Sequence, residues 1–290
     1  MPSDFCPPPL APLYVVPTPL GNLADLSARA REILTSVSWV AAEDTRHSAL
    51  LLRHIGARPR LFSAHAHNEQ KAAEQILKNL AAGEAVALVT DAGTPGISDP
   101  GARIVAHVHA AGGRVIPLPG PCAAITALSA SGLEATRWFF YGFLPATAGA
   151  RQKELAALKH WACPIVFYEA PHRVVESATD LALILGGERR LFVARELTKQ
   201  FESTAVLPLS EAANWFMADP MRQKGEFVLI VTGRNEEEES TESSAAGERA
   251  LQILLADGLP VRQAARLAAQ WSGHDKKSLY KRALLMRKER

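Results

Sequence analysis

Hydrophobic residues in the first half of this chain form short runs that alternate with segments of helical periodicity. Short apolar runs bounded by turn residues predict strands, and apolar positions three and four residues apart predict helices that bury one face. Leu26, Ala30, Leu34 and Val37 follow the first run at helical spacing. This repetition of strand and helix is typical of a parallel sheet covered by helices. We expect its strands at residues 13–17, 39–42, 60–63, 85–89 and 114–118.

The pattern restarts near residue 134, where we place a domain boundary. A short connector separates two of the apolar runs that follow, 191–195 and 204–209, which predicts a hairpin. The sheet of this half is therefore expected to be mixed rather than wholly parallel. Its strands are expected at residues 139–144, 164–168, 191–195, 204–209 and 227–231.

Three segments outside these domains differ in composition. The proline-rich start, residues 1–12, is expected to be a disordered tail. Residues 234–247 hold five glutamates and one arginine among small polar residues, which predicts a flexible acidic linker. Residues 248–290 return to helical spacing in three short stripes, typical of a helix-turn-helix module. The predicted fold is thus two α/β domains, residues 13–133 and 134–233, followed by a small helical module.

Charge is distributed unevenly along the chain, although the formal net charge is only +2. From residue 274 to residue 290 there are seven Lys or Arg residues and two acidic ones, a balance that suits contact with a phosphate backbone. The alternative is an ordinary solvated helix face. Three scattered cysteines, Cys6, Cys122 and Cys163, fit neither a disulfide framework nor metal-ligand spacing. With no signal peptide, and no apolar run near the roughly 18 residues of a membrane span, a cytoplasmic protein is expected.

The segment from Val89 to Gly101 is the most informative stretch of the sequence. It follows an apolar run and contains three glycines and two prolines. Ligands of open α/β sheets bind beyond the carboxyl ends of strands, and glycine lets a ligand approach the backbone closely. A plain turn is the alternative, but a turn needs fewer such residues. We therefore expect a ligand at this bend.

Polar clusters also follow strands in both halves, at residues 43–47, 65–69, 169–173 and 195–199. Their positions predict a cleft between the two domains. The phosphate-binding motif G-x-x-x-x-G-K-[ST] and the dinucleotide motif G-x-G-x-x-G are both absent from the sequence. His65 and His67 have no third ligand beside them, so no metal site is expected. Glu169 and Glu196 suit either catalysis or structural ion pairs, and the sequence leaves both open.

Seven ordered motifs together resemble the tetrapyrrole-methylase-like superfamily of S-adenosylmethionine enzymes, and within it the methyltransferases of small-subunit ribosomal RNA. The resemblance covers about residues 13–233 and, more weakly, the helical tail. The motifs are PTPLGNL at 17–23, AEDTR at 42–46, DAGTPGISDPG at 91–101, PGPCA at 119–123, YGFLP at 141–145, EAPHR at 169–173 and RELTK at 195–199.

This resemblance implies a two-domain α/β fold with the cofactor in the cleft, a homodimer, and 2′-O-methylation of a cytidine ribose in the decoding centre of 16S rRNA, within the small ribosomal subunit. Cys122 stands where many relatives have a serine. Carried over by position, the residues that meet S-adenosylmethionine are Leu20, Ala92, Gly93, Thr94, Ile97, Cys122, Ala123, Tyr168 and Leu197.

A ribose hydroxyl is a weak nucleophile at neutral pH, so a base or a cation near it would help transfer. The cations could instead grip phosphates. Residues 146–148 lack the basic character expected after YGFLP, so Arg151 and Lys153 are expected to contact RNA there. The candidates for catalysis are Asp44 and Arg46 in the first half and Glu169, His172, Arg173, Glu196 and Lys199 in the second.

Two other functions fit parts of the sequence. One is a methylase that acts on a small tetrapyrrole or on a protein with the same cofactor, which the basic tail disfavours. The other is a non-catalytic RNA-binding assembly factor, which would show no turnover.

Overall fold

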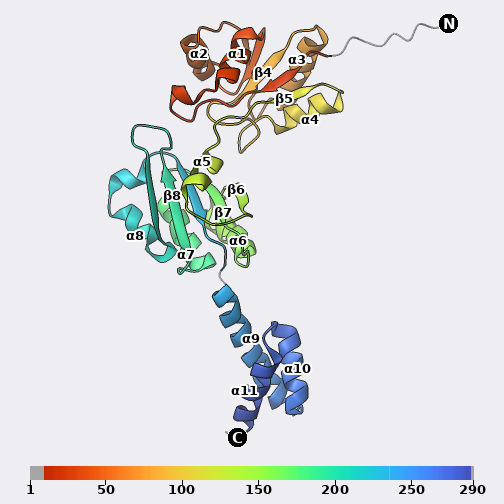
Figure 1. The fold of residues 1–290 in the computed structure, drawn as a ribbon, viewed down its shortest axis with the longest axis vertical. Coiled ribbons are helices and arrows are strands. Elements are labelled where there is room, and N and C mark those ends of the chain that lie inside the picture. Colours follow the sequence, from red (N-terminus) through yellow and green to blue (C-terminus); the bar gives the residue numbers. More distant parts are fainter. Residues whose placement is uncertain (1–9, 235, 289–290) are drawn as a thin grey trace, which may run out of the picture. The chain divides into compact units, whose positions relative to one another are not determined.

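The computed structural model describes residues 10–234 and 236–288 (Figure 1). They form two compact units. One comprises the described chain up to Ala156 together with Pro164–Val231, and the other comprises Ala157–Cys163 and the described chain from Thr232 onward. None of the helices in the described ranges is long and apolar enough to cross a membrane. Most of the predicted tail, residues 1–12, lies outside the described residues, but Ala11 donates a backbone hydrogen bond to the carbonyl of Leu80 at 3.0 Å.

The first sheet is wholly parallel, as predicted, with strand order β3-β2-β4-β1-β5. Its helices are α1 (Ala28–Ser36), α2 (Thr45–His54), α3 (Glu69–Ala81) and α4 (Ala102–Ala110), with a short 3₁₀ turn at Leu23–Asp25. Its strands are β1 (Leu13–Val15), β2 (Trp39–Ala42), β3 (Arg60–Ser63), β4 (Val86–Val89) and β5 (Val115–Pro117).

Alternate residues of this sheet enter two separate cores, because successive side chains of a strand point to opposite faces. Val40 and Val89 pack with Leu34 of α1 and Leu52 of α2 in one cluster. A second cluster joins Ala41 and Leu88 of the same strands to α3 and α4, through Ile76, Leu80, Ile104 and Val108. Helices therefore cover both faces of the sheet, and only the ends of its strands are open to a ligand.

The second sheet is mixed, with strand order β6-β7-β10-β8-β9, and β8 and β9 form the predicted antiparallel hairpin. Ala124 and Ala127 of helix α5 (Ala123–Ala130) pack on one face against Val166 and Val228. The other helices of this half are α6 (Ala148–Leu158), α7 (Val174–Leu185) and α8 (Ala212–Met217), with 3₁₀ turns at Leu209–Glu211 and Pro220–Gln223. The strands are β6 (Phe139–Phe143), β7 (Ile165–Glu169), β8 (Arg190–Arg195), β9 (Ser203–Pro208) and β10 (Phe227–Val231).

The last part of the described chain forms helices α9 (Glu236–Ala256), α10 (Val261–Ser272) and α11 (Lys276–Lys288). They share a core of their own, in which Leu251, Ala265 and Leu279 are fully buried or nearly so. The prediction of a flexible linker over residues 234–247 is wrong for its helical part, because α9 already begins at Glu236. Glu and Ala have high helix propensity, so a segment rich in them can form helix without an apolar stripe.

Candidate functional site

A pocket of about 340 Å³ lies beyond the carboxyl ends of strands in the first unit. Its volume is within the range of about 300–1,000 Å³ that is usual for small-molecule and cofactor sites. The loops after the neighbouring strands β1 and β4 enter the pocket. These loops lead in opposite directions along the sheet, from β1 toward β2 on one side and from β4 toward β5 on the other, so they mark a topological switch point. Such a switch point is where open α/β sheets bind ligands. Residues of both sheets line it, including all nine that the resemblance assigns to the cofactor: Leu20, Ala92, Gly93, Thr94, Ile97, Cys122, Ala123, Tyr168 and Leu197.

The two loops at the switch point are joined to each other. Thr18 donates its N–H to the carbonyl of Gly93 at 2.9 Å and accepts the N–H of Gly93 at 3.0 Å. The hydroxyl of Thr18 also donates to the carbonyl of Thr90 at 3.0 Å. Gly93 has a φ of +83°, a conformation that residues with a Cβ rarely adopt. Since both backbone groups of Gly93 are bonded to Thr18, the main-chain donors left for a ligand at this bend belong to its neighbours Ala92 and Thr94.

The rest of the Val89–Gly101 loop is held by bonds of its own. The N–H of Gly96 donates to the carbonyl of Pro100 at 3.2 Å, and the hydroxyl of Thr94 donates to the carbonyl of Pro121 at 2.8 Å. Glu69, at the start of α3, accepts the N–H of Gly101 at 2.9 Å. The loop is thus shaped before a ligand arrives, which lowers the entropy that binding must overcome.

Backbone strain in the described chain is concentrated beside this pocket. Among described residues other than glycine, a positive φ occurs at Ser98 (66°), Glu196 (51°) and Thr198 (66°). Ser98 lies between Ile97 and Asp99, and Glu196 and Thr198 flank Leu197. These three neighbours, Ile97, Asp99 and Leu197, line the pocket. Residues held in sparsely populated conformations cluster at ligand sites, where the surrounding structure enforces them.

Tyr168 connects the pocket wall to the start of α5. Its hydroxyl accepts the N–H of Ala124 at 3.1 Å, and its ring packs edge-on against Phe140 and Phe143 at centroid distances of 5.0 and 5.6 Å. Burial, together with the neighbouring Cys122, raises the pKa of the Tyr168 hydroxyl well above its usual value. The side chain is therefore neutral at physiological pH and acts here as a fixed, uncharged wall.

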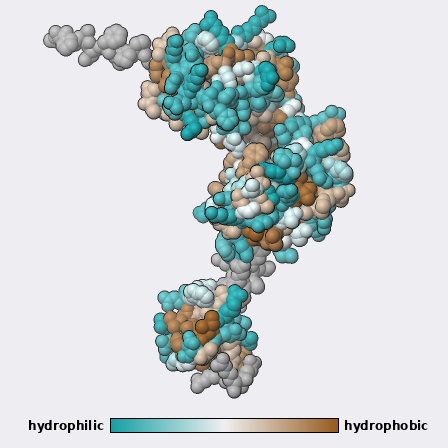
Figure 2. Space-filling model, turned by 180° about the vertical axis from the view of Figure 1, so that it is seen from behind, coloured by the Kyte–Doolittle hydropathy of each residue, from teal (hydrophilic) through white to brown (hydrophobic). Residues whose placement is uncertain are grey.

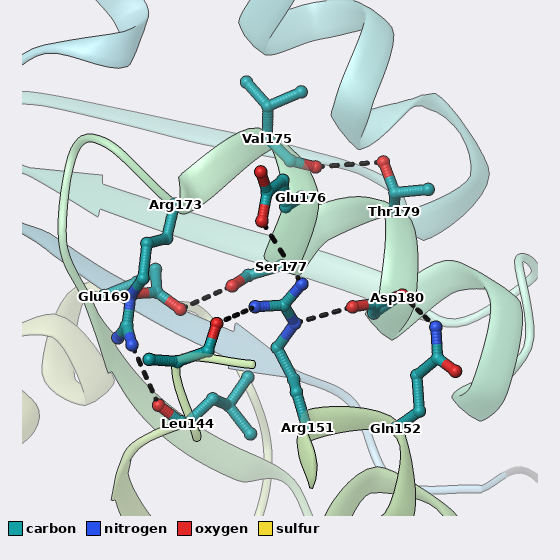
Figure 3. A network of polar contacts seen from close by, with 11 residues as sticks. Leu144, Arg151, Gln152, Glu169, Arg173, Val175, Glu176, Ser177, Thr179 and Asp180 are labelled. Carbon is teal, nitrogen blue, oxygen red and sulfur yellow. Dashed lines mark hydrogen bonds and ion pairs between the residues drawn. The ribbon is translucent and has the colours of Figure 1, made fainter. Parts of the chain in front are cut away.

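Glu169 and Arg173 form a buried structural pair (Figure 3). One carboxylate oxygen of Glu169 accepts from Nε and Nη2 of Arg173 at 2.9 and 2.6 Å and from the N–H of Ala170 at 2.7 Å. The other accepts from the hydroxyl of Ser177 at 2.6 Å, while Nη1 of Arg173 donates to the carbonyl of Leu144 at 3.2 Å. With both oxygens occupied and no exposed side-chain surface, Glu169 is placed to fix the loop after β7 rather than to move a proton.

Glu196 and Lys199 are likewise bonded within the protein. Lys199 Nζ donates to Glu196 at 3.0 Å and to Glu226 at 2.9 Å, and Glu196 also accepts the N–H of Glu226 at 2.9 Å. Burial alone would raise the pKa of Glu196, but these hydrogen bonds outweigh it and the pKa is lowered. The stem of Lys199 packs on Gly21, where a Cβ would meet its Cγ. These residues thus tie the loop after β8 to the loop after β1.

The remaining catalytic candidates do not line the pocket. Asp44 caps α2 by accepting the N–H of Arg46 at 2.8 Å, and the side chain of Arg46 is 91% exposed. The hydrogen bonds from Arg46 lower the pKa of Asp44 to about 2. His172 is exposed as well. Asp44 and Arg46 therefore pair with each other at the start of α2, and neither lines the pocket.

The expectation that Arg151 contacts RNA is wrong. Its side chain is 2% exposed and its Nε donates to Asp180 at 2.6 Å, with Glu176 at 3.5 Å from Nη2 (Figure 3). Gln152 completes the cluster by donating to Asp180 at 2.8 Å. Arg151 therefore fastens α6 to α7, and of the two expected RNA contacts only Lys153 is exposed.

Asp99 is the main site residue that sequence reasoning missed, although it stands in the motif at 91–101. Burial, and then the nearby carboxylates of Glu43, Asp91 and Glu226, raise the pKa of Asp99 to about 7. No sequence pattern separates Asp99 from Asp91, because the shift depends on which carboxylates the fold brings together. Within the described chain, no group of three or more His, Cys, Asp or Glu residues suits a metal ion. Other lining residues that were not expected are Phe143, Ala170, Pro171, Ala194, Glu226, Phe227 and Val228.

The fold thus combines a parallel sheet, a mixed sheet and a pocket at the switch point of the first sheet. Residues 12–213 match the family described as tetrapyrrole (corrin/porphyrin) methylases. The uroporphyrin-III-C-methyltransferase of Thermus thermophilus has the same fold, with a TM-score of 0.55 and 19% identity over 77% of this chain and 94% of that one. Another structure of that enzyme, complexed with S-adenyl homocysteine, has a TM-score of 0.53, 18% identity and coverage of 77% and 97%.

Sequence relatives narrow this class to one family. Residues 241–287 match the RsmI C-terminal HTH domain. The protein named ribosomal RNA small subunit methyltransferase I in Escherichia coli O157:H7 is 49% identical over 94% of this chain and 94% of its own length. Its namesake in Pseudomonas aeruginosa is 47% identical over 94% of this chain and 96% of its own. The chain therefore belongs to the ribosomal RNA small subunit methyltransferase I family.

Proposed function

We propose that this protein transfers the methyl group of S-adenosylmethionine to the 2′-hydroxyl of a cytidine ribose in the decoding centre of 16S rRNA. The observation that carries the proposal is the pocket at the switch point, because residues from separate motifs and both sheets converge there. Family membership supplies the reaction class, and the structure complexed with S-adenyl homocysteine supplies the cofactor class.

The residues present fit S-adenosylmethionine. Leu20, Ile97 and Leu197 offer apolar walls for a flat aromatic base. The N–H groups of Thr94 and of Ala123, in the first turn of α5, donate to no group within the described residues and are free for polar ends of a ligand. When bound, the cofactor supplies an electrophilic methyl on a sulfonium. The protein then has to hold it and orient the ribose hydroxyl, which can contribute roughly 7–11 kcal/mol.

A methyl-transfer assay tests this function directly. The full-length protein is incubated with labelled S-adenosylmethionine and small ribosomal subunits from cells that lack the modification, and the modified nucleotide is mapped. We expect one 2′-O-methylated cytidine in 16S rRNA. Label on a ribosomal protein would support a protein methylase, and no transfer at all would support a tetrapyrrole methylase or a non-catalytic assembly factor. Free 16S rRNA in a parallel reaction shows whether the assembled subunit is needed.

The C-terminal helices are proposed to contact the RNA. Lys276, Lys277 and Lys281 are exposed on α11, and the exposed aromatic side chains of Trp271 (73%) and Tyr280 (40%) suit stacking on bases. Figure 2 shows apolar side chains at the surface of this bundle among hydrophilic ones. A surface that combines cations with exposed rings is typical of single-stranded RNA binding.

Lys276→Ala with Lys277→Ala is expected to weaken RNA binding and leave cofactor binding unchanged. Each lost phosphate contact lowers the salt slope of the binding constant by about 0.7–0.9. Filter binding of 16S rRNA at several salt concentrations measures this slope. Lys71→Ala with Lys78→Ala is the matched control, since it removes two exposed charges from α3. Equal slopes for the two double variants would contradict the assignment.

The acting species is proposed to be a homodimer that works on the small ribosomal subunit in the cytoplasm. Family membership supports the dimer, because the resemblance to this family implies a homodimer. Sedimentation of the full-length protein at the concentration of the methylation assay measures the oligomeric state, and a monomer that retains full activity would contradict the dimer.

A further inference from the structure

Three acidic residues line the pocket, and one of them has no partner. Glu169 accepts four hydrogen bonds, and Glu226 accepts one from Lys199. The carboxylate of Asp99 accepts no hydrogen bond and forms no ion pair with any residue that the structure describes. It is half-buried, on the loop that carries the strained Ser98. Asp99 is thus a free carboxylate on a rigid loop in the wall of the proposed cofactor pocket.

Three carboxylates and one neutral hydroxyl interact electrostatically with Asp99 from several elements. Glu43 follows β2, Asp91 follows β4 and Glu226 precedes β10, and the hydroxyl of Tyr168 faces it from β7. The first two are held by main-chain bonds: Glu43 accepts the N–H of Asp91 at 3.3 Å, and Asp91 accepts the N–H of Asp44 at 3.1 Å. Burial and this repulsion raise the pKa of Asp99 to about 7. A base with a pKa near the working pH is both available and strong enough to take a proton.

We propose that Asp99 is the general base that accepts the proton of the ribose 2′-hydroxyl, an inference that rests on the proposed function. As the ribose oxygen bonds to the methyl carbon, the carbon–sulfur bond breaks and its electron pair stays on sulfur. The hydroxyl proton passes to a carboxylate oxygen of Asp99, which later releases it to solvent. Charge balances, since a sulfonium and a carboxylate become a neutral thioether and a carboxylic acid.

The other carboxylates are less suited to this role. Both oxygens of Glu169 are occupied by Arg173, Ala170 and Ser177. Glu196 is bonded to Lys199 and has a lowered pKa, which makes it a weak base. Asp44 lies outside the pocket wall. Asp99 therefore combines access to the pocket with basicity, which none of these three does.

Kinetics of Asp99→Asn test the proposal. We expect kcat to fall by about 10²–10⁴-fold, a much larger loss than that of the affinity for S-adenosylmethionine measured by calorimetry. The wild-type rate is expected to rise with pH through an inflection near pH 7, or somewhat lower because the positive sulfonium offsets part of the repulsion. That inflection is expected to vanish in Asp99→Asn. Glu226→Gln is expected to move it to lower pH, because one of the repelling charges is gone.

Two readouts do not depend on activity. Carboxyl ¹³C NMR of the ligand-free protein with labelled aspartate is expected to show one resonance that titrates near pH 7 and is missing in Asp99→Asn. Stability gives the second. Between the usual carboxyl pKa of 3.8 and about 7 the folded state keeps a proton that the unfolded state releases, so stability falls as pH rises through this window. Asp99→Asn lacks this penalty and is expected to melt above wild type at about pH 8.5 but not at about pH 4.

The outcomes separate this inference from the function on which it rests. Wild-type protein that methylates 16S rRNA, with an Asp99→Asn variant of equal kcat and unchanged pH profile, would overturn the role of Asp99 and leave the function standing. Wild-type protein that transfers no methyl to RNA would overturn the function instead. A lower melting temperature of Asp99→Asn at every pH would also overturn the inference, since it would show a structural role.

Discussion

Gly93→Val is expected to lower the affinity for S-adenosylmethionine by more than about 100-fold, which corresponds to about 2.7 kcal/mol. A β-branched residue at a φ of +83° is strained, and the backbone cannot relax without breaking both hydrogen bonds to Thr18. The new Cβ would lie 3.4 Å from Leu20, which lines the pocket, so the larger side chain would intrude on the wall. Calorimetric titration with S-adenosylmethionine measures the loss.

Gly112→Val is the control for this prediction. Gly112 has a φ of +73° at the end of α4, and a Cβ there would meet nothing within 4 Å. It carries a similar backbone penalty without touching the pocket, so its cofactor affinity should equal that of wild type. Circular dichroism at the titration temperature confirms that both variants are folded. Wild-type affinity in Gly93→Val would remove the bend from the binding site.

Arg151→Met is expected to destabilise the protein by about 3–5 kcal/mol, because it leaves the carboxylate of Asp180 buried without its cation. The side chains of Arg151 and Asp180 are only 2% and 9% exposed, so water cannot replace the lost partner. The exposed Glu176 is expected to remain solvated and to contribute little. Urea unfolding followed by circular dichroism measures the change, with the slope checked to show that the transition stays two-state.

Two further variants isolate the cause of that loss. Arg151→Met combined with Asp180→Leu removes both charges, and replacing a whole buried pair with apolar residues is often close to neutral. The double variant should therefore recover most of the stability. Arg46→Ala breaks an exposed pair and should leave the urea midpoint unchanged. If the double variant were as unstable as Arg151→Met alone, the unpaired carboxylate would not be the reason.

The local patterns of the chain predicted most of the framework. Every strand in the described part of the chain lies within an expected run or within a residue of one. Strands such as β4 and β10 are buried on both faces, which leaves a clear apolar signature. Helix α5 was missed, since its sequence AAITALSA consists of small or apolar residues and shows no amphipathic stripe. The acidic start of α9 was missed for the opposite reason, because it has no apolar positions at all. Periodicity detects a helix only where one face differs from the other.

The part of the site that depends on glycine and proline residues was predictable from the sequence. The Gly and Pro residues of the bend mark a positive φ and a fixed loop, and the nine residues expected at the cofactor all line one pocket. The roles of charged residues were not predictable. Arg151 was expected at an RNA surface and is buried, and Asp99 was passed over although its carboxylate stands free in the pocket.

By itself, then, the sequence determined the two α/β halves, the helical tail, the family and the bend at the edge of the first sheet. These depend on local periodicity and on residue types whose backbone preferences act wherever they stand. Only the tertiary structure decided which carboxylates are paired and which is free, because the pKa and the pairing of a carboxylate depend on groups that the fold brings close to it. Glu43 and Glu226 act on Asp99 from two other loops, while Asp180 pairs with Arg151 from the next helix. Burial and pairing give each of these groups a pKa or a role that no local pattern encodes.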